Sequence, residues 1–389
     1  MSPSSIEIRK FDHTHSDFSH HIREFVSFHW RHYRHEPRFI PLLNIEFLGL
    51  KIVGMRGFFE PSYSLFQHGK VCFLTAYRDR EVVGRTMVFT NDHHNQHWHD
   101  HVGFFGFFEC IEDQEVANKL LSTAGQWLRE QGMDTLRGPQ NLPINEATPG
   151  ILIDGFDAIP MVYYHYNHPY YQKLLVENGM QLAKRVMGFK VPVQTPIAAE
   201  LKEVTARLRQ RYNIRIEPFT RRNIKEFREY MFEIYNEAWD NNWGFVPFTR
   251  NELFRNIEDM MLIWDPAMFL FAFVDEQPAA FFGSVPNIFE RMKPNYAFRR
   301  LDIIRAVKML LTKHRIKTFR QGYFGIKPKY RRIGLDAILL YEAKAYTQQQ
   351  GYESCDIGWV LEDNTAILKA TDFMGGHLSR EYGIYQKIL

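Results

Sequence analysis

The sequence predicts an α/β protein made of two similar halves in tandem. Two observations predict this: short stretches of the first half recur in the second half in the same order, and each half alternates strand-like and helix-like patterns. At 389 residues the chain is also long for one hydrophobic core, so two domains are the natural expectation.

Each half opens with a strand and later forms a hairpin. "IEIRKF" (6–11) resembles "IRIEPF" (214–219), and a helical stretch follows each of them. Further along, "FLTAYRDREVVGRTMVF" (73–89) matches "FLFAFVDEQPAAFFGSV" (269–285). Both of these stretches alternate apolar residues across a short polar turn, which is typical of a β-hairpin.

Each half then continues with a strand, a long helix and a further strand. "GFFECIEDQEVANKLL" (106–121) aligns without gaps with "GIKPKYRRIGLDAILL" (325–340). The same register brings Gly132 onto Gly351, where each helix is expected to end. The offset between the halves is larger here than at the hairpins, so the second half carries an insertion, which we place at 286–320.

The boundary between the halves lies near residue 193. "VPVQTP" (191–196) interrupts the pattern, and "IAAELKEVTARLRQRY" (197–212) is typical of a helix that leads into the second half. We therefore predict a first domain at 1–193, a linker helix at 194–212 and a second domain at 213–389.

Composition limits the partners and the compartment. A net charge of +3 is too small to indicate a nucleic-acid partner. Three widely spaced cysteines, Cys72, Cys110 and Cys355, favour reduced thiols over a disulfide framework. No apolar run approaches the roughly 20 residues of a membrane span, and the first residues lack the apolar core of a signal peptide. We expect a cytoplasmic protein of undetermined oligomeric state.

The two aligned helix starts differ in charge. A helix N-terminus offers unpaired N–H groups and a partial positive charge, so it attracts anions, and a glycine there lets a ligand approach closely. Carboxylates at the same place would satisfy the dipole and repel a phosphate. The sequence thus predicts a phosphate site in the second half alone, with an ordinary exposed helix start as the alternative. The second half has Arg331, Arg332 and Gly334 where the first has Glu112, Asp113 and Glu115.

This order of elements, together with the loop, resembles the GNAT acyltransferase superfamily. The family signature, Arg/Gln-x-x-Gly-x-Gly/Ala, corresponds here to Arg331-Arg332-Ile333-Gly334-Leu335-Asp336. The resemblance implies two tandem GNAT-like domains with a degenerate first copy, each a mixed, mostly antiparallel sheet flanked by helices. It also implies acyl-CoA or acetyl-CoA as co-substrate and no metal. The loop would hold the pyrophosphate of the cofactor, while the pantetheine arm would lie along Phe324, Gly325 and Ile326, near Asn364.

The catalytic groups are less clearly marked. Glu362 is the candidate base for the amine, and its alternative is an acidic residue in the first turn of a helix. Tyr385 or Tyr382 is the candidate acid. Thr371 stands where many GNAT enzymes have a tyrosine on the fourth helix, so the resemblance leaves the acid unassigned. Asp336 replaces a small residue of the signature, and Asn364 is also placed to cap a helix.

Two polar and aromatic segments are candidates for the acceptor side of the site. They are "GPQNLPINEATPGILIDGFD" (138–157) and "YHYNHPYY" (164–171), and the alternative is hydrogen-bonded loop structure. With "WVLEDN" they resemble a bacterial group of tandem GNAT-like proteins that includes ceramide synthases of the GNAT type. The candidate acceptor-binding residues are Asn141, Asn145, Asp154, Asn167, Tyr170 and Tyr171.

The resemblance therefore implies an N-acyltransferase that transfers an acyl group from CoA to an amine, including a long-chain, sphingoid-type amine. One alternative is a short-chain N-acetyltransferase acting on a soluble amine, peptide or sugar. The other alternative, from a different class, is a non-catalytic CoA-binding protein, which the missing tyrosine and Asp336 suggest.

Two further stretches have distinctive compositions. In "NDHHNQHWHDH" (91–101), His97, His99 and His101 would share one face if the chain were extended, but a solvated loop without metal is the expectation. In the insertion, Ile303, Ile304, Val307, Leu310 and Leu311 fall on one helical face among many Lys and Arg. Such a helix suits peripheral contact with an anionic membrane, at the inner face for a cytoplasmic protein. The alternative is a helix packed on its domain with a charged outer face.

Overall fold

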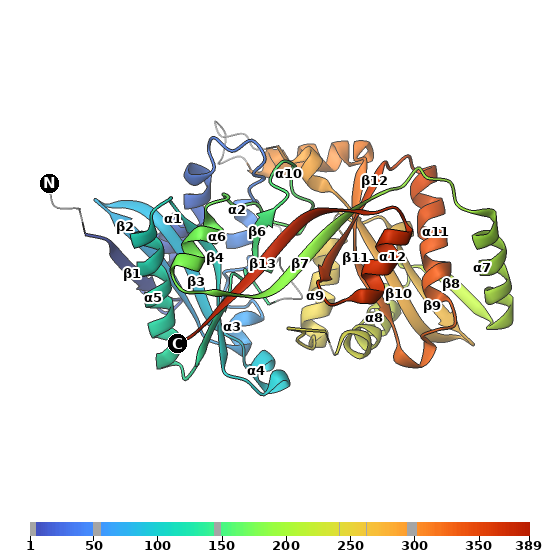
Figure 1. The fold of residues 1–389 in the computed structure, drawn as a ribbon, viewed down its shortest axis with the longest axis horizontal. Coiled ribbons are helices and arrows are strands. Elements are labelled where there is room, and N and C mark those ends of the chain that lie inside the picture. Colours follow the sequence, from blue (N-terminus) through green and yellow to red (C-terminus); the bar gives the residue numbers. More distant parts are fainter. Residues whose placement is uncertain (1–4, 50–55, 144–148, 241, 262, 294–301) are drawn as a thin grey trace. The chain divides into compact units, whose positions relative to one another are not determined.

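The structure, a computed structural model, describes residues 5–49, 56–143, 149–240, 242–261, 263–293 and 302–389. The chain forms two compact units, each assembled from separate segments (Figure 1). The first unit comprises Met1–Val186, Met292–Lys308 and Arg380–Leu389, and the second comprises Met187–Arg291 and Met309–Ser379. Both units combine a mixed sheet with helices, so the predicted fold class is confirmed.

The sheet of the first unit follows the strand order β1-β2-β3-β4-β5-β13, and β6 also pairs with β13. All of these pairings are antiparallel except that of β4 with β5, which is parallel. The hairpin predicted at 73–89 is the pair β2 and β3. The strands are β1 (Glu7–Phe11), β2 (Val71–Arg78), β3 (Glu81–Thr90), β4 (Val102–Cys110), β5 (Thr135–Gly138), β6 (Ile151–Asp154) and β13 (His377–Ile388).

Helices cover both faces of this sheet because strand residues alternate between the faces. Leu74 packs with Leu120 of α5 in one core, whereas its neighbour Phe73 packs with Phe25 of α1 in the other. A sheet with two apolar faces needs helices on both sides. The helices of this unit are α1 (Phe18–His32), α2 (Asn44–Leu48), α3 (Leu65–His68), α4 (Asp92–Trp98), α5 (Gln114–Glu130) and α6 (Tyr171–Glu177).

The second unit repeats this plan with the strand order β12-β11-β10-β9-β8. Here β11 and β12 are parallel and the other pairs are antiparallel. The second predicted hairpin is the pair β9 and β10. The strands are β8 (Ile214–Pro218), β9 (Phe269–Val274), β10 (Gln277–Pro286), β11 (Thr318–Ile326) and β12 (Ser354–Leu361).

The alternation of faces recurs as well. Leu339 of α11 packs with Ala272 of β9 in one core, while Phe227 of α8 contacts Phe271 on the other face, with ring centroids 4.9 Å apart. The helix predicted at 197–212 is α7. The helices are α7 (Ala199–Arg211), α8 (Ile224–Trp239), α9 (Arg250–Met260), α11 (Leu335–Gln349) and α12 (Thr365–Phe373), with short 3₁₀ helices η2 (Pro266–Met268), η3 (Ile288–Arg291), η5 (Lys313–Arg315) and η6 (Pro328–Tyr330).

Three elements run from one unit into the other. Strand β7 (Gln181–Pro192) and helix α10 (Asp302–Thr312) start in the first unit and end in the second, and β13 runs the opposite way. The division predicted near residue 193 therefore stays a prediction, because the units are not two consecutive stretches of chain. None of the described helices combines the length and the apolar composition that a membrane-spanning helix needs.

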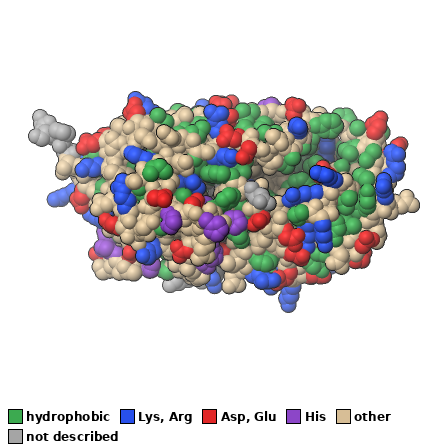
Figure 2. All heavy atoms as spheres, turned by 60° about the horizontal axis from the view of Figure 1, so that its bottom comes forward, with side chains coloured by type: hydrophobic (Ala, Val, Ile, Leu, Met, Phe, Trp, Pro, Cys, Tyr) green, Lys and Arg blue, Asp and Glu red, His purple; other side chains and the backbone are tan. Residues whose placement is uncertain are grey.

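Asp92–Trp98 of the histidine-rich stretch forms helix α4, so the predicted extended and loop conformations are wrong for His97, whereas His99 and His101 follow the helix. Asn91 caps α4 by accepting a hydrogen bond from the His94 amide at 3.1 Å. Asparagine is common both in turns and at helix N-caps, so this residue type does not distinguish a loop from a helix start. Several histidine side chains cluster in one region of the face shown in Figure 2. Among the described residues, no group of three metal-binding side chains includes His97, His99 or His101.

Candidate active site

The start of α11 is shaped by two residues in the left-handed region. Arg332 has φ of +72°, and Gly334, the N-cap of α11, has φ of +83°. A Cβ atom added to Gly334 would lie 2.5 Å from Leu208 Cδ1 of α7. Because left-handed backbone and close approach both favour glycine, the sequence at this position is dictated by the turn.

The turn leaves a row of backbone donors without acceptors. The six consecutive amides from Arg332 to Ala337 donate to no protein acceptor within the part of the chain that the structure describes, and no side chain caps α11. Helix N-termini normally leave about four such donors, which side chains, water or ligands satisfy. The turn before Gly334 extends the row, so this loop presents an unusually large set of N–H groups for an anion.

The equivalent helix of the first unit satisfies its own donors. The Asp113 carboxylate accepts hydrogen bonds from the amides of Glu115 at 2.9 Å and Val116 at 3.3 Å. The same carboxylate pairs with Arg78 Nη2 at 2.8 Å. A phosphate would have to displace this carboxylate, so the two copies differ in geometry as well as in charge.

The predicted cofactor arginines are exposed at this loop. The Arg331 guanidinium donates to the backbone oxygens of Ile326 at 3.4 Å and Ala238 at 3.1 Å, so it ties the loop to the ends of β11 and α8. Asp336 is exposed in the first turn of α11, and its side chain accepts no hydrogen bond from the helix start. The deviation at Asp336 from the GNAT signature therefore leaves the turn intact.

Strand β11 has a free edge beside this loop. It pairs with β10 as far as Ile326, but with β12 only from Thr318 to Gln321. The Trp239 indole, at the end of α8, donates to the Phe324 carbonyl at 2.9 Å. The N–H and C=O of one residue in an antiparallel pair point to the same side, so the Phe324 N–H also faces away from β10, into the space where β11 and β12 diverge.

The residues predicted near the far end of β12 have local partners. Asn364 caps α12 by accepting a hydrogen bond from the Ile367 amide at 3.3 Å, so its contacts are those of the capping alternative. Thr371 is buried and donates to the Ile367 carbonyl at 2.8 Å. Glu362 is exposed just beyond the last residue of β12.

The comparison with solved structures covers the chain almost from end to end. A tandem GNAT protein from the clavulanic acid biosynthesis pathway superposes with a TM-score of 0.55, covering 99% of this chain and 98% of that chain at 10% sequence identity. The chain has the tandem GNAT fold. The predicted resemblance is thus confirmed, although no family model matches the sequence.

Two curated proteins are similar in sequence to this chain. Protein YghO of Escherichia coli strain K12 is 26% identical over 378 residues, which are 94% of this chain and 92% of that protein. The bacterial ceramide synthase of Caulobacter vibrioides is 26% identical over 331 residues, which are 83% of this chain and 85% of that protein.

In the first copy, the chain itself fills the gap where two strands diverge. Strand β4 pairs with β5 only from Val102 to Phe104, and the Phe107 amide then donates to Asn141 Oδ1 at 2.8 Å. A Cβ atom added to Gly106 would lie 2.0 Å from the backbone oxygen of Gln140. In the first copy, residues 140 and 141 therefore lie where β4 and β5 diverge, and Asn141 satisfies a strand amide there.

Other predicted acceptor residues also bind the protein itself. Asn167 is buried and exchanges hydrogen bonds with the Leu152 amide and carbonyl, as the loop-structure alternative expects. Asp154 is exposed at the end of β6, and Asn145 lies outside the described residues. Their assignment to the acceptor stays a prediction.

The two candidate acids belong to the first unit. The Tyr382 hydroxyl donates to the His165 carbonyl at 3.0 Å, and its ring stacks on Tyr164. Tyr385 lies in the core that contains α5, and burial raises its pKa. Both rings are buried, so neither geometry is that of an acid open to a substrate in this conformation.

Tyr171 is part of a buried polar network that sequence reasoning missed. The Glu109 carboxylate accepts hydrogen bonds from Tyr33 at 2.6 Å and Tyr171 at 2.8 Å, and lies 3.9 Å from the guanidinium of buried Arg85. Burial raises the pKa of Glu109, and Arg85 opposes that shift. Tyr170 lies beside this network and donates to the Cys110 carbonyl at 2.8 Å. The only sequence signal was a glutamate in an otherwise apolar strand.

We expect Glu109→Ala to destabilise the protein by about 3–5 kcal/mol, because it leaves Arg85 charged and buried without its carboxylate. Urea denaturation followed by circular dichroism measures the change. The control is Glu177→Ala in α6, whose carboxylate forms an exposed pair with Lys173 and should matter by less than about 0.5 kcal/mol. Equal effects of the two variants would contradict a structural role for the network.

Proposed function

We propose that this protein transfers an acyl group directly from acyl-CoA to an amine. The observation that carries the proposal is the row of six amides at the start of α11, beside the free edge of β11. Oriented N–H groups at a helix start suit a pyrophosphate, and the exposed Arg332 adds positive charge. In this arrangement acyl-CoA supplies the thioester carbon that the amine attacks.

The residues around β11 then act on the reacting groups. The amine nitrogen forms a bond with the thioester carbon, the C–S bond breaks, and the leaving thiolate takes up a proton. The Phe324 N–H is placed to donate to the oxyanion that develops on the carbonyl. Glu362 is the proposed base for the amine proton, and Tyr385 or Tyr382 remains the proposed proton donor, which requires a movement that exposes its hydroxyl.

We infer that the acceptor is a long-chain, sphingoid-type amine. Similarity over most of the chain to a bacterial ceramide synthase supports this choice. An acceptor of that kind resides in a bilayer, so the proposal includes peripheral contact with a membrane. Acetyl transfer to a soluble amine is the competing outcome of the experiment below.

The test is a matrix of acyl-CoA chain lengths, from acetyl to palmitoyl, against amines that include sphinganine, polyamines, glucosamine and peptides. Release of CoA is followed with a thiol reagent, and the amide is identified by mass spectrometry. Turnover with sphinganine and long acyl chains supports the proposal. Turnover only with acetyl-CoA and a soluble amine overturns the acceptor, and CoA binding without any turnover overturns the enzyme.

Glu362→Gln is expected to lower kcat by at least about tenfold, since a general base contributes roughly 10²–10⁴ to the rate, while the Kd for CoA stays within twofold. Steady-state kinetics and calorimetry measure the two quantities. Asp363→Asn, one residue away and also exposed, is the matched control and should leave kcat unchanged. A large drop in melting temperature without a specific loss of kcat would instead assign Glu362 to the start of α12.

A further inference from the structure

Helix α10 exposes its apolar face and buries a charge. Arg305 is only 6% exposed, and its Nη2 atom donates to the backbone oxygens of Pro41 at 3.0 Å and Met292 at 2.9 Å. The alternative that places charges on the outer face of this helix is therefore wrong for Arg305. The exposed side chains are Ile303 (52%), Ile304 (55%), Val307 (50%), Leu310 (43%) and Leu311 (72%), and we call them the α10 apolar face.

An apolar face of this kind calls for a partner. The five residues recur at helical spacing on an eleven-residue helix, so they form one continuous strip. Single exposed hydrophobic residues are ordinary, but contiguous exposed patches mark sites that contact proteins or membranes. These five side chains contribute little to the fold by burial, unlike the buried Met309 of the same helix, so their spacing on one side is not explained by core packing.

The charge around the strip identifies the chemistry of the partner. Residues 303–317 contain five Lys or Arg and no Asp or Glu. Lys313, Arg315 and Lys317 are all exposed directly after the helix. The nearby Glu290 carboxylate accepts hydrogen bonds from the amides of Lys317 and Thr318, so it neutralises this cluster only in part. A strip of apolar side chains next to exposed cations is complementary to an anionic lipid surface.

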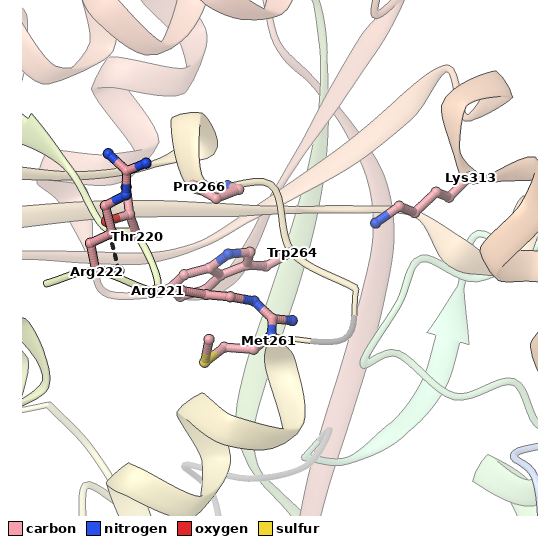
Figure 3. Close-up of a pocket in the computed structure, with 7 residues that line it drawn as sticks. All are labelled: Thr220, Arg221, Arg222, Met261, Trp264, Pro266 and Lys313. Carbon is pink, nitrogen blue, oxygen red and sulfur yellow. Dashed lines mark hydrogen bonds between the residues drawn. The ribbon is translucent and has the colours of Figure 1, made fainter. Parts of the chain in front are cut away.

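A cationic cavity adjoins the end of the helix in the second unit. Lys313, the residue after α10, shares this open cavity of about 430 Å³ with Arg221 and Arg222. In Figure 3 the Lys313 side chain extends toward the other lining residues from the opposite side. Among the residues that the structure describes, no acidic one lines the cavity, and Met261, Trp264 and Pro266 provide apolar walls. An anionic headgroup with part of its chain fits such a lining.

We propose that the α10 apolar face docks the protein on an anionic lipid bilayer, with one headgroup in the cavity formed by Arg221, Arg222 and Lys313. The inference deepens the proposed function, since a long-chain amine would be drawn from the same bilayer, but docking itself requires no turnover. A second copy of this chain suits the α10 apolar face less well, because pairing two such faces would bring like charges together. The structure therefore favours lipid over self-association.

The test is co-sedimentation of the full chain with vesicles, either of phosphatidylcholine alone or of phosphatidylcholine with about 30% phosphatidylglycerol. Each is measured at about 50 mM and at about 500 mM salt. Each interfacial cation strengthens binding by roughly fivefold, so anionic vesicles should bind the protein at least about tenfold better at low salt. The triple variant Ile304→Asp, Val307→Asp and Leu311→Asp should lose binding to all vesicles by at least about tenfold.

Two further variants separate the contributions. Val176→Asp in α6 is the matched control, because Val176 is 51% exposed and Val307 is 50% exposed, and it should leave binding unchanged. Replacing Arg221, Arg222 and Lys313 by Gln should weaken the preference for phosphatidylglycerol and lower the sensitivity to salt, while the exposed Arg315 and Lys317 retain part of both. Light scattering of each variant without vesicles reports whether the protein is a monomer or a dimer.

The outcomes distinguish this inference from the proposed function. Vesicle binding that the triple variant loses supports docking even if no amine is acylated. Acylation of a soluble amine with no vesicle binding overturns docking and leaves an acyltransferase. A wild-type dimer that the triple variant dissociates, without vesicle binding, assigns the face to self-association and also overturns docking.

Discussion

The double variant Arg331→Glu, Gly334→Val is expected to abolish measurable CoA binding. A side chain at position 334 would strain a backbone with φ of +83° and collide with Leu208, and the glutamate would repel a phosphate. Losing two hydrogen bonds to a charged group costs about 3–6 kcal/mol, which is more than a hundredfold in Kd. Isothermal titration calorimetry with CoA measures the loss.

Two controls separate anion binding from folding. Gly375→Val tests backbone strain alone, because Gly375 also has a positive φ, of +73°, but an added Cβ meets nothing within 4 Å. Its CoA affinity should match that of the wild type. Replacing Glu112, Asp113 and Glu115 by Ala in the first copy should cost about 1 kcal/mol of stability through loss of the Asp113 cap, again without changing CoA affinity. Unaltered CoA affinity in the 331/334 variant would end the phosphate-loop proposal.

Acid is expected to destabilise the protein steeply below about pH 6.5. Burial lowers the pKa of His32 and His94 to about 3 and that of His165 to about 4, and it holds the pKa of His29 well below its usual value. The unfolded chain binds these protons at about pH 6.5 and the folded chain does not, so stability is present above that pH. Each histidine then removes up to about 1.4 kcal/mol per pH unit as the pH falls toward its folded pKa.

One substitution makes this pH dependence specific. The His29 ring is buried and packs beside Phe39 and Phe47. His29→Phe should therefore keep or raise stability at pH 8 and reduce the slope between pH 6 and pH 4.5 by about one proton. Glu109 acts in the opposite sense, because burial raises its pKa, so it offsets at most one of the four protons. Chemical denaturation at a series of pH values measures the slope; an unchanged slope would show that His29 is protonated in the folded state.

Much of the fold could be predicted because it depends on local periodicity. The hairpins and the strand–helix–strand segments have apolar patterns that each half repeats. Arg332 of the second half aligns with Asp113 of the first, and this change of charge indicated the loop before α11 as an anion site. Amphipathicity alone predicted that α10 has an apolar face. It could not predict that this face points outward, because the partners that bury Arg305 include Pro41, more than 260 residues away along the chain.

The rest of the site depends on contacts that local patterns do not encode. The network joins Glu109 to Tyr33, Arg85 and Tyr171. These four residues lie in four separate parts of the chain. Trp239 reaches the Phe324 carbonyl across 85 residues of sequence. Asn141 and Asn167 are typical of loops wherever they occur, so only the structure shows that they hold backbone groups of their own unit.

The last strand also imposes an order on biosynthesis. Residues 380–389 belong to the first unit, where Tyr385 pairs with Gly138 of β5 and Gly383 pairs with Ile151 of β6. Domains commonly fold in turn as a ribosome releases them, from the N-terminus onward. Here the first unit is completed only after residues 380–389 have been synthesised, and until then β5 and β6 lack this partner, an unpaired edge of the kind that invites aggregation. Nascent chains that stop short of residue 380 thus contain both copies of the repeat, but the first copy cannot complete its sheet.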